Sequence, residues 1–220
     1  MTAVPQYYPV FLELRGRRCL LIGGDREIQR KAELLLECGA EVTVVSPQLT
    51  PRLAELVRDG SIDWEERSYQ YGDLKGAFLA IASSDDHRVN RQVGHEAKVE
   101  RVLLNVVDKP ALCTFIAPAI VRRGEVVIAI STGGASPALA RRLRESLEAS
   151  EATRWADLAP VLSRARSELK RRRVQVHPDR WQECLDDVLL RMVQEGQEEA
   201  ALKRLVSMLV EGVEEQGVVR

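Results

Sequence analysis

The 220-residue sequence has few cysteines, and they are far apart. They form neither a CxxC pair nor a Cys/His cluster with the spacing of a zinc site, and the histidines lack metal-ligand spacing as well. The residues concerned are Cys19, Cys38, Cys113, Cys184, His87, His95 and His177. We therefore expect free thiols, a reducing compartment and no stable metal site.

The sequence also lacks long apolar runs and a large net charge. Its N-terminus has no basic start followed by an unbroken apolar stretch, and no segment approaches the roughly 18 uncharged apolar residues of a membrane span. Lys and Arg number 32 against 33 Asp and Glu, so no overall field favours nucleic acid. The basic run at 170–173 is typical of a helix C-terminus. We expect a cytoplasmic protein with neither a membrane nor a nucleic-acid partner.

Short apolar or β-branched runs alternate with helical patterns over the first 150 residues. Thr50-Pro51 and Ser136-Pro137 are N-cap and N1 pairs, and Ser84 or Asp85 can cap a helix that runs to about Lys98. Strands are predicted at 18–22, 41–45, 62–66, 77–82, 102–107 and 126–131. Helical spacing alone remains from residue 151 onward. The sequence predicts an α/β, Rossmann-like, doubly wound and mainly parallel sheet in a domain of residues 1–150, followed by a helical tail at 151–220.

The first predicted strand leads into Gly23-Gly24-Asp25-Arg26-Glu27-Ile28, at the place where a Rossmann fold binds the pyrophosphate of NAD. Asp25 occupies the second glycine position of the G-x-G-x-x-G fingerprint, and Ile28 occupies the third. The Asp25 carboxylate either faces the phosphates or serves as an N-terminal partner for the helix. Tight turns use glycine for conformational reasons too, so the turn alone leaves nucleotide binding open.

No acidic residue follows the second strand to bind a ribose, so backbone contacts would have to substitute there. The candidate cofactor-binding residues are Gly23, Gly24, Asp25, Arg26, Glu27, Ser46, Pro47, Gln48 and Ser84.

Four segments together resemble the precorrin-2 dehydrogenase and sirohydrochlorin ferrochelatase family, the N-terminal module of siroheme synthases. They are YPVFLELRGRRCLLIGG, RKAELLLECGAEVTVVSP, AFLAIASSDDHRVNRQV and NVVDKPALCTFIAPAIVRRGEVVIAISTGGASPALARRLRESLE. The resemblance covers about residues 7 to 150. The last block is the most specific, because it contains NVVD, FIxPAI and STGGxSPxLAR in that order.

The resemblance implies NAD-dependent oxidation of precorrin-2 to sirohydrochlorin by a homodimer, and some members of the family also insert ferrous iron. It makes Asp108 the proton acceptor, and Thr132 matches a substrate-site serine of some relatives. Candidate substrate-binding residues are Asn105, Ser131, Thr132, Gly133 and Ser136. Without the resemblance, the favoured interpretation of Asp108 is a cap of the turn before Lys109-Pro110. Ser136 is expected to cap its helix in any case.

Four arginines, Arg122, Arg123, Arg141 and Arg142, are candidates to pair with substrate carboxylates, although most are expected to be simply solvated. Two alternatives to the dehydrogenase stay open. One is a chelatase or tetrapyrrole carrier that has lost NAD binding through Asp25 and Glu27. The other is a non-catalytic interaction module that binds another enzyme of the pathway through the helical tail.

Overall fold

The computed structural model describes residues 6–214, with side chains up to Glu211. The chain divides into two compact units, Met1–Ala117 and Pro118–Arg220. The outermost residues of the two predicted domains, 1–5 and 215–220, lie outside the described part. No helix between residues 6 and 214 has the length and apolar character needed to cross a bilayer.

The first unit is a five-stranded sheet in the order β3-β2-β1-β4-β5, and every neighbouring pair of strands is parallel. The strands are β1 (Arg18–Ile22), β2 (Glu41–Val45), β3 (Asp63–Glu65), β4 (Leu79–Ala82) and β5 (Leu103–Val106). The helices are α1 (Arg26–Glu37), α2 (Pro51–Arg58) and α3 (His87–Glu100), with a short turn of 3-10 helix, η1 (Pro110–Leu112), after β5. The expected Rossmann-like fold is confirmed.

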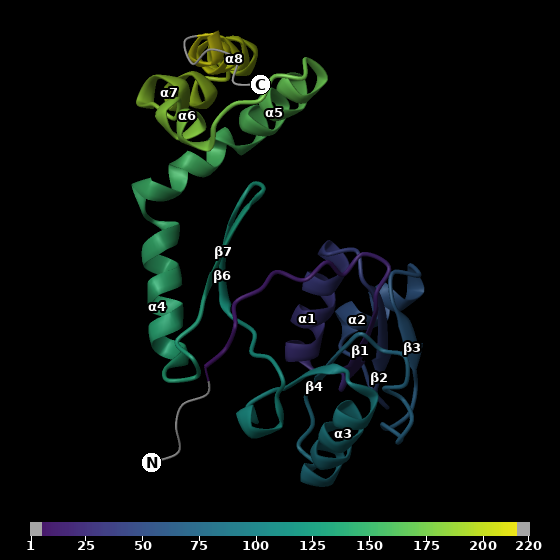
Figure 1. The fold of residues 1–220 in the computed structure, drawn as a ribbon. Coiled ribbons are helices and arrows are strands. Elements are labelled where there is room, and N and C mark those ends of the chain that lie inside the picture. The colour runs from purple at the N-terminus through teal and green to yellow at the C-terminus, as the bar shows by residue number, and fades with distance from the viewer. Residues whose placement is uncertain (1–5, 215–220) are drawn as a thin grey trace. The chain divides into compact units, whose positions relative to one another are not determined.

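The two faces of this sheet have separate apolar cores. Figure 1 shows helices α1, α2 and α3 around the sheet. On one face, Ile28 and Ala32 of α1 and Leu53 of α2 pack against β1, β2 and β4. On the other face, Val93 and Ala97 of α3 pack against β1, β4 and β5. Strand order reverses beside β1, so the carboxyl ends of β1 and β4 form the switch point at which doubly wound sheets bind ligands.

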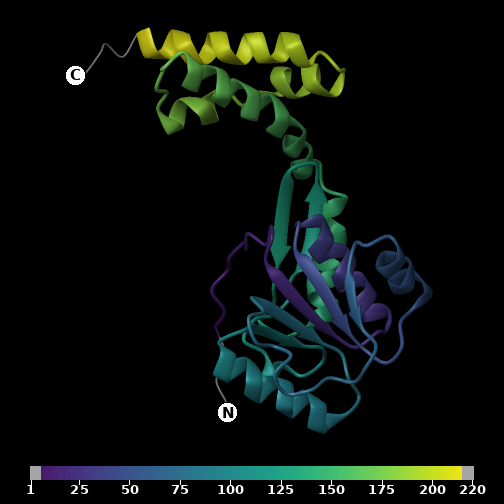
Figure 2. The same ribbon diagram turned by 90° about the vertical axis from the view of Figure 1, so that its right-hand side faces the viewer.

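The second unit begins with an antiparallel hairpin, β6 (Ala119–Arg123) and β7 (Val126–Ile130), and helix α4 (Pro137–Glu148) packs against it (Figure 2). The segment 126–131 was expected to extend the parallel sheet, and that expectation is wrong. Gly124 and Glu125 alone join the two strands, and two residues can make a hairpin but not a crossover to a parallel neighbour. The compact units therefore divide at 117/118, whereas the sequence predicted a boundary at 150/151.

The rest of the second unit is helical, as the sequence predicts. It comprises η2 (Glu151–Leu158), α5 (Ala159–Arg171), α6 (Pro178–Glu183), α7 (Asp187–Gln194) and α8 (Glu198–Glu214). Figure 2 shows α8 lying along α5, and Ala165, Leu169, Leu205 and Leu209 from these two helices belong to one buried cluster. This cluster gives the helical part a core of its own.

Candidate functional site

The glycine turn after β1 is held against two neighbouring loops. Gly23 has φ 118°, and a Cβ there would lie 2.4 Å from the carbonyl oxygen of Ser83. At Gly24 a Cβ would lie 1.8 Å from the carbonyl oxygen of Gln48. Both positions therefore require glycine, one for its backbone conformation and both for the close approach of other backbone segments. This packing gathers the turn and the loops after β2 and β4 at the carboxyl edge of the sheet.

Asp25 is the N-cap of α1, the second of the two roles that its sequence position allowed. One carboxylate oxygen accepts a hydrogen bond from the amide of Ile28 at 2.8 Å, and the other accepts one from the hydroxyl of Ser83 at 2.5 Å. Ser83 was absent from the predicted site, and no local pattern pointed to this bond because the two residues are 58 positions apart. The carboxylate closes the turn between β1 and α1.

The same turn presents unused backbone donors. Within the described residues, the amides of Gly24, Asp25, Arg26 and Glu27 have no hydrogen-bond acceptor. Consecutive free amides at a helix N-terminus are a typical anion-binding arrangement. The Glu27 carboxylate pairs with Arg30 and Lys31, which offset its charge. The backbone amides of the turn can therefore bind a pyrophosphate. The Asp25 carboxylate close by is a like charge that would weaken this binding.

The segment Ser46-Pro47-Gln48 follows β2 and shapes the second side of the turn. The hydroxyl of Ser46, which is buried, donates to the carbonyl of Gln48 at 2.6 Å, and the indole of Trp64 donates to the carbonyl of Ser46 at 2.9 Å. As predicted, Thr50 caps α2 by accepting from the amide of Leu53. These contacts fix the loop that touches Gly24.

Ser84 lies two residues before the N-cap of the helix that it was expected to cap. Asp86 is the N-cap of α3 and accepts from the amide of Arg88 at 2.7 Å, so the prediction of Ser84 or Asp85 as cap is wrong. The Ser84 hydroxyl instead accepts from the Asp86 amide, and its carbonyl accepts from the buried side chain of Asn90. Asp86 directly follows Asp85 and is an equally good capping residue, so local sequence cannot decide which of these adjacent polar residues caps the helix.

Asp108 lies just beyond the carboxyl end of β5, at the same edge of the sheet as the glycine turn. It occupies a turn closed by the amide of Lys109 and the carbonyl of Val106, with φ 56°. Its side chain is exposed and makes no hydrogen bond or ion pair with any described residue, so it does not cap this turn. A left-handed conformation costs a non-glycine residue roughly 1 kcal/mol, and such outliers concentrate at functional sites.

The loop that carries Asp108 is fastened to β5 by residues that sequence reasoning did not single out for this purpose. The sulfur of Cys113 accepts from the Val106 amide at 3.2 Å and lies 3.3 Å and 3.4 Å from the carbonyl oxygens of Val106 and Lys109. Burial raises the pKa of the Cys113 thiol, which keeps it a protonated donor. The Asn105 amide, a predicted substrate contact, donates to the carbonyl of Phe115 at 3.1 Å. Both side chains brace the turn beneath Asp108.

The other predicted substrate residues lie in the second unit, in the loop between β7 and α4. The Thr132 hydroxyl accepts from the amide of Ser136 and donates to its carbonyl, both at 3.1 Å. Ser131 accepts from the amide of Gly133, and Ser136 caps α4 through the amide of Leu139, as expected. The loop is therefore ordered by its own hydroxyl groups.

The structure separates the candidate arginines. Arg123 makes a bidentate pair with Asp157 at 2.8 Å and 2.7 Å, which fixes the hairpin to η2. Arg141 pairs with Glu145 on the surface of α4. Arg122 and Arg142 make no ion pair within the described residues. Of the four candidates, these two therefore have a charge that is not offset by a carboxylate of the described residues and could pair with a substrate carboxylate.

The matches to known protein families follow the division of the chain into two units. Residues 10–119 match the family described as putative NAD(P)-binding, and residues 123–150 match the one described as sirohaem biosynthesis protein central. The solved structure of SirC, precorrin-2 dehydrogenase, superposes with a TM-score of 0.71 at 25% identity, covering 90% of this chain and 98% of that one.

Curated relatives extend the similarity across both units. The siroheme synthase of Nitrosococcus oceani is 41% identical over 217 residues, which are 97% of this chain and 46% of that protein. The siroheme synthase of Azotobacter vinelandii is 41% identical over 205 residues, 92% of this chain and 44% of that protein. The chain thus spans about half the length of the curated relatives it matches. From the strand order, the glycine turn and these matches, the chain belongs to the putative NAD(P)-binding family, in the form found in siroheme synthases.

Proposed function

We propose that this protein oxidises precorrin-2 to sirohydrochlorin with NAD as the hydride acceptor. The proposal rests on one observation, the position of Asp108. This exposed carboxylate lies in a left-handed turn at the carboxyl edge of the sheet, and the glycine turn lies at the same edge. The similarity to siroheme synthases and to a precorrin-2 dehydrogenase supplies the substrate. The tetrapyrrole loses a hydride and a proton in this reaction, so the site needs a proton acceptor.

In this proposal, the hydride acceptor would be NAD. The amides of Gly24 to Glu27 would hold its pyrophosphate, with the loops at Gln48 and Ser84 beside it. Asp108 accepts the substrate proton on a carboxylate oxygen, while Cys113 and Asn105 keep its turn in place. Arg122, Arg142 and the 131–136 loop are proposed to bind substrate carboxylates.

A homodimer is part of the same proposal. Helix α4 has no fully buried residue, and it leaves Leu139 50% and Leu143 42% exposed. Ile120 of β6 and Trp155 of η2 are also substantially exposed. Exposed large apolar side chains on several elements of one unit are the kind of side chain that an interface would bury. We also propose a cytoplasmic location, which the four free cysteines support.

The direct test is turnover of precorrin-2 by the full chain with NAD, followed by absorbance of the product. We expect stoichiometric formation of NADH and sirohydrochlorin. Calorimetric titration with NAD alone and with the tetrapyrrole alone separates the alternatives. Tetrapyrrole binding without NAD binding would support the carrier or chelatase, which the Asp25 charge at the turn favours, and ferrous iron in a further arm would tell these two apart. Binding of neither would support the interaction module.

Asp25→Asn is expected to tighten NAD binding about fivefold to tenfold, equivalent to ~1 kcal/mol for one like-charge contact relieved at the surface. Asparagine is as good an N-cap as aspartate, so α1 should keep its start. Calorimetry at low and high salt measures the effect, which should shrink as salt screens the charge.

The matched control is Glu27→Gln, which removes a carboxylate already offset by Arg30 and Lys31 and should change NAD affinity little. Equal affinities of wild type and Asp25→Asn at low salt would show that the Asp25 carboxylate does not lie near the phosphates.

A further inference from the structure

An open cavity of about 430 Å³ lies in the helical part of the second unit, and none of the residues that line it belongs to the proposed catalytic site. Leu169, Val174 and Val176 form its apolar lining, and the ring of Trp181 forms a wall. Ligand sites usually have volumes of about 300–1,000 Å³ with apolar surfaces and a few polar groups. The cavity is therefore large enough to hold part of an organic ligand.

The polar groups at this cavity are cationic. Arg166, Lys170 and Arg173 line it, and none of the lining residues in the described part of the chain is acidic. Within the described part of the chain, none of these three makes an ion pair. The guanidinium of Arg166 lies 5.7 Å from the centre of the Trp181 ring, in cation–π contact.

Other cations in α5 and at its C-cap do have carboxylate partners, unlike the three at the cavity. Arg164 pairs with Glu199 at 2.5 Å, and Arg171 and Arg172 both pair with Glu168. A favourable interaction with the C-terminus of α5 would apply to all the basic residues there. It does not explain why the cations at the cavity lack carboxylate partners while those on the other faces have them. Uncompensated like charges on one helix face repel each other, and an anion would relieve this.

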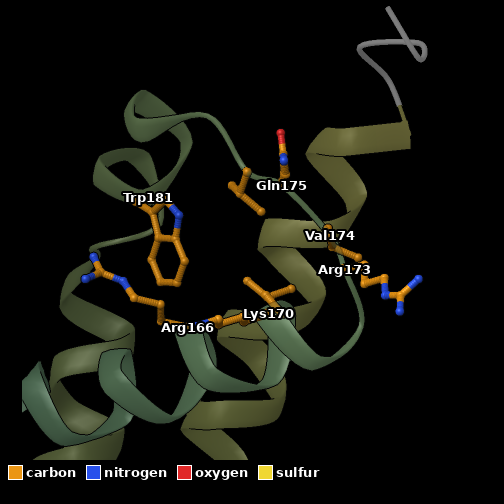
Figure 3. A pocket seen from close by; sticks show the side chains of 8 residues that line it. Arg166, Lys170, Arg173, Val174, Gln175 and Trp181 are labelled. Atoms are coloured by element: carbon orange, nitrogen blue, oxygen red, sulfur yellow. The ribbon is translucent and has the colours of Figure 1, made fainter. Parts of the chain in front are cut away.

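The spacing of the charges discriminates among anions. Figure 3 shows Arg166 beside the Trp181 ring, Lys170 next along the helix, and Arg173 at the far side of the cavity with its guanidinium directed outward from the ring. Arg166 and Lys170 are one turn apart, about 6 Å along the helix axis, and Arg173 lies beyond the helix end. Phosphates of a nucleotide are grouped at one point, whereas carboxylates around a macrocycle are spread along its edge.

We propose that this cavity binds the edge of a flat polycarboxylate macrocycle of the tetrapyrrole class, as a holding site separate from the catalytic site. Trp181 stacks on the ring system, and Arg166, Lys170 and Arg173 bind its peripheral carboxylates. The choice of a tetrapyrrole among flat polyanions rests on the proposed function. A site of this kind holds substrate or product outside the catalytic centre without chemical change.

The test uses uroporphyrin, a stable tetrapyrrole with eight carboxylates, and the full chain with Trp64→Phe and Trp155→Phe, which leaves Trp181 as the reporter. Quenching of Trp181 emission is titrated in this background and in the same background with Arg166→Gln, Lys170→Gln and Arg173→Gln. We expect the charge variant to bind at least about tenfold more weakly, the effect of three modest ion pairs. Circular dichroism checks the fold of each variant.

The matched control carries Arg164→Gln, Arg171→Gln and Arg172→Gln, which remove the same charge from the same region but from paired residues. It should keep near-normal affinity. An equal loss in both variants, no loss in the first, or equal quenching by ADP would overturn the proposal. The turnover assay is run in parallel. Site-specific quenching without turnover would support this site and contradict the proposed reaction. Turnover without such quenching would support the reaction and contradict this site.

Discussion

Asp108→Asn is expected to lower the turnover number by at least about a hundredfold, because the amide cannot accept the substrate proton as a carboxylate does. The KM for NAD should change little, since the glycine turn and not Asp108 holds that group in the proposed site. Asparagine tolerates the left-handed conformation that Asp108 adopts, so the free energy of unfolding should stay within roughly 0.5 kcal/mol of wild type. Stopped-flow turnover and urea denaturation measure the two effects.

The control for this experiment is Asp85→Asn. Asp85 is also an exposed aspartate just beyond a strand end, after β4, and the same charge is removed. It should leave turnover nearly unchanged. If Asp108→Asn turned over at a near-normal rate, the carboxylate would not be the proton acceptor, and the strained turn would need another explanation.

Glu96→Ala is expected to destabilise the first unit by about 3 kcal/mol or more, the largest stability effect that we predict. Glu96 is 1% exposed and accepts three hydrogen bonds, from the hydroxyl of Tyr69 and from the amides of Gly72 at 3.0 Å and Leu74 at 2.9 Å. Removing the carboxylate leaves three donors without a partner in or near the core, at about 1–3 kcal/mol each when fully buried. Urea denaturation followed by circular dichroism measures the loss.

Glu96→Gln is the informative companion, because it keeps the size of the side chain and one accepting oxygen. Its loss of stability should lie between wild type and Glu96→Ala. A loss below about 1 kcal/mol for Glu96→Ala would mean that water replaces the carboxylate and that the loop at 69–74 is less tightly held than the structure indicates.

Wild type should also lose stability as the pH rises above about 10, the ordinary pKa of tyrosine. Burial and the bond to Glu96 raise the pKa of Tyr69 in the folded protein, so the folded state keeps a proton that the unfolded state releases. The contribution of protonated Tyr69 to the free energy of unfolding is fully present at neutral pH. The loss of stability in alkali should be smaller in Glu96→Ala, which lacks the bond to Tyr69. Urea denaturation at pH values from about 7 to above 10 measures the difference.

The positions of most elements of the first unit were predictable because they follow local rules. Apolar and β-branched runs mark β1, β2, β4 and β5, and parallel strands buried on both faces need such runs. The caps at Thr50 and Ser136 were predictable for the same reason, since a hydroxyl reaches an amide only three residues away. The glycine turn became a candidate as the segment that follows a strand, whereas Asp108 became one mainly through the family resemblance.

The sequence by itself determined the parallel strands of the first unit, the helix starts at Thr50 and Ser136 and the order of these elements, because backbone sterics and hydrophobic periodicity act over a few residues. Tertiary structure alone decided which partners those elements met. It joined Asp25 to Ser83, buried Glu96 under the 69–74 loop and left the cations at the Trp181 cavity without carboxylates. Each of these outcomes depends on residues that are distant in sequence. Contacts of that kind depend on how packed layers bring chain segments together, which no local pattern specifies.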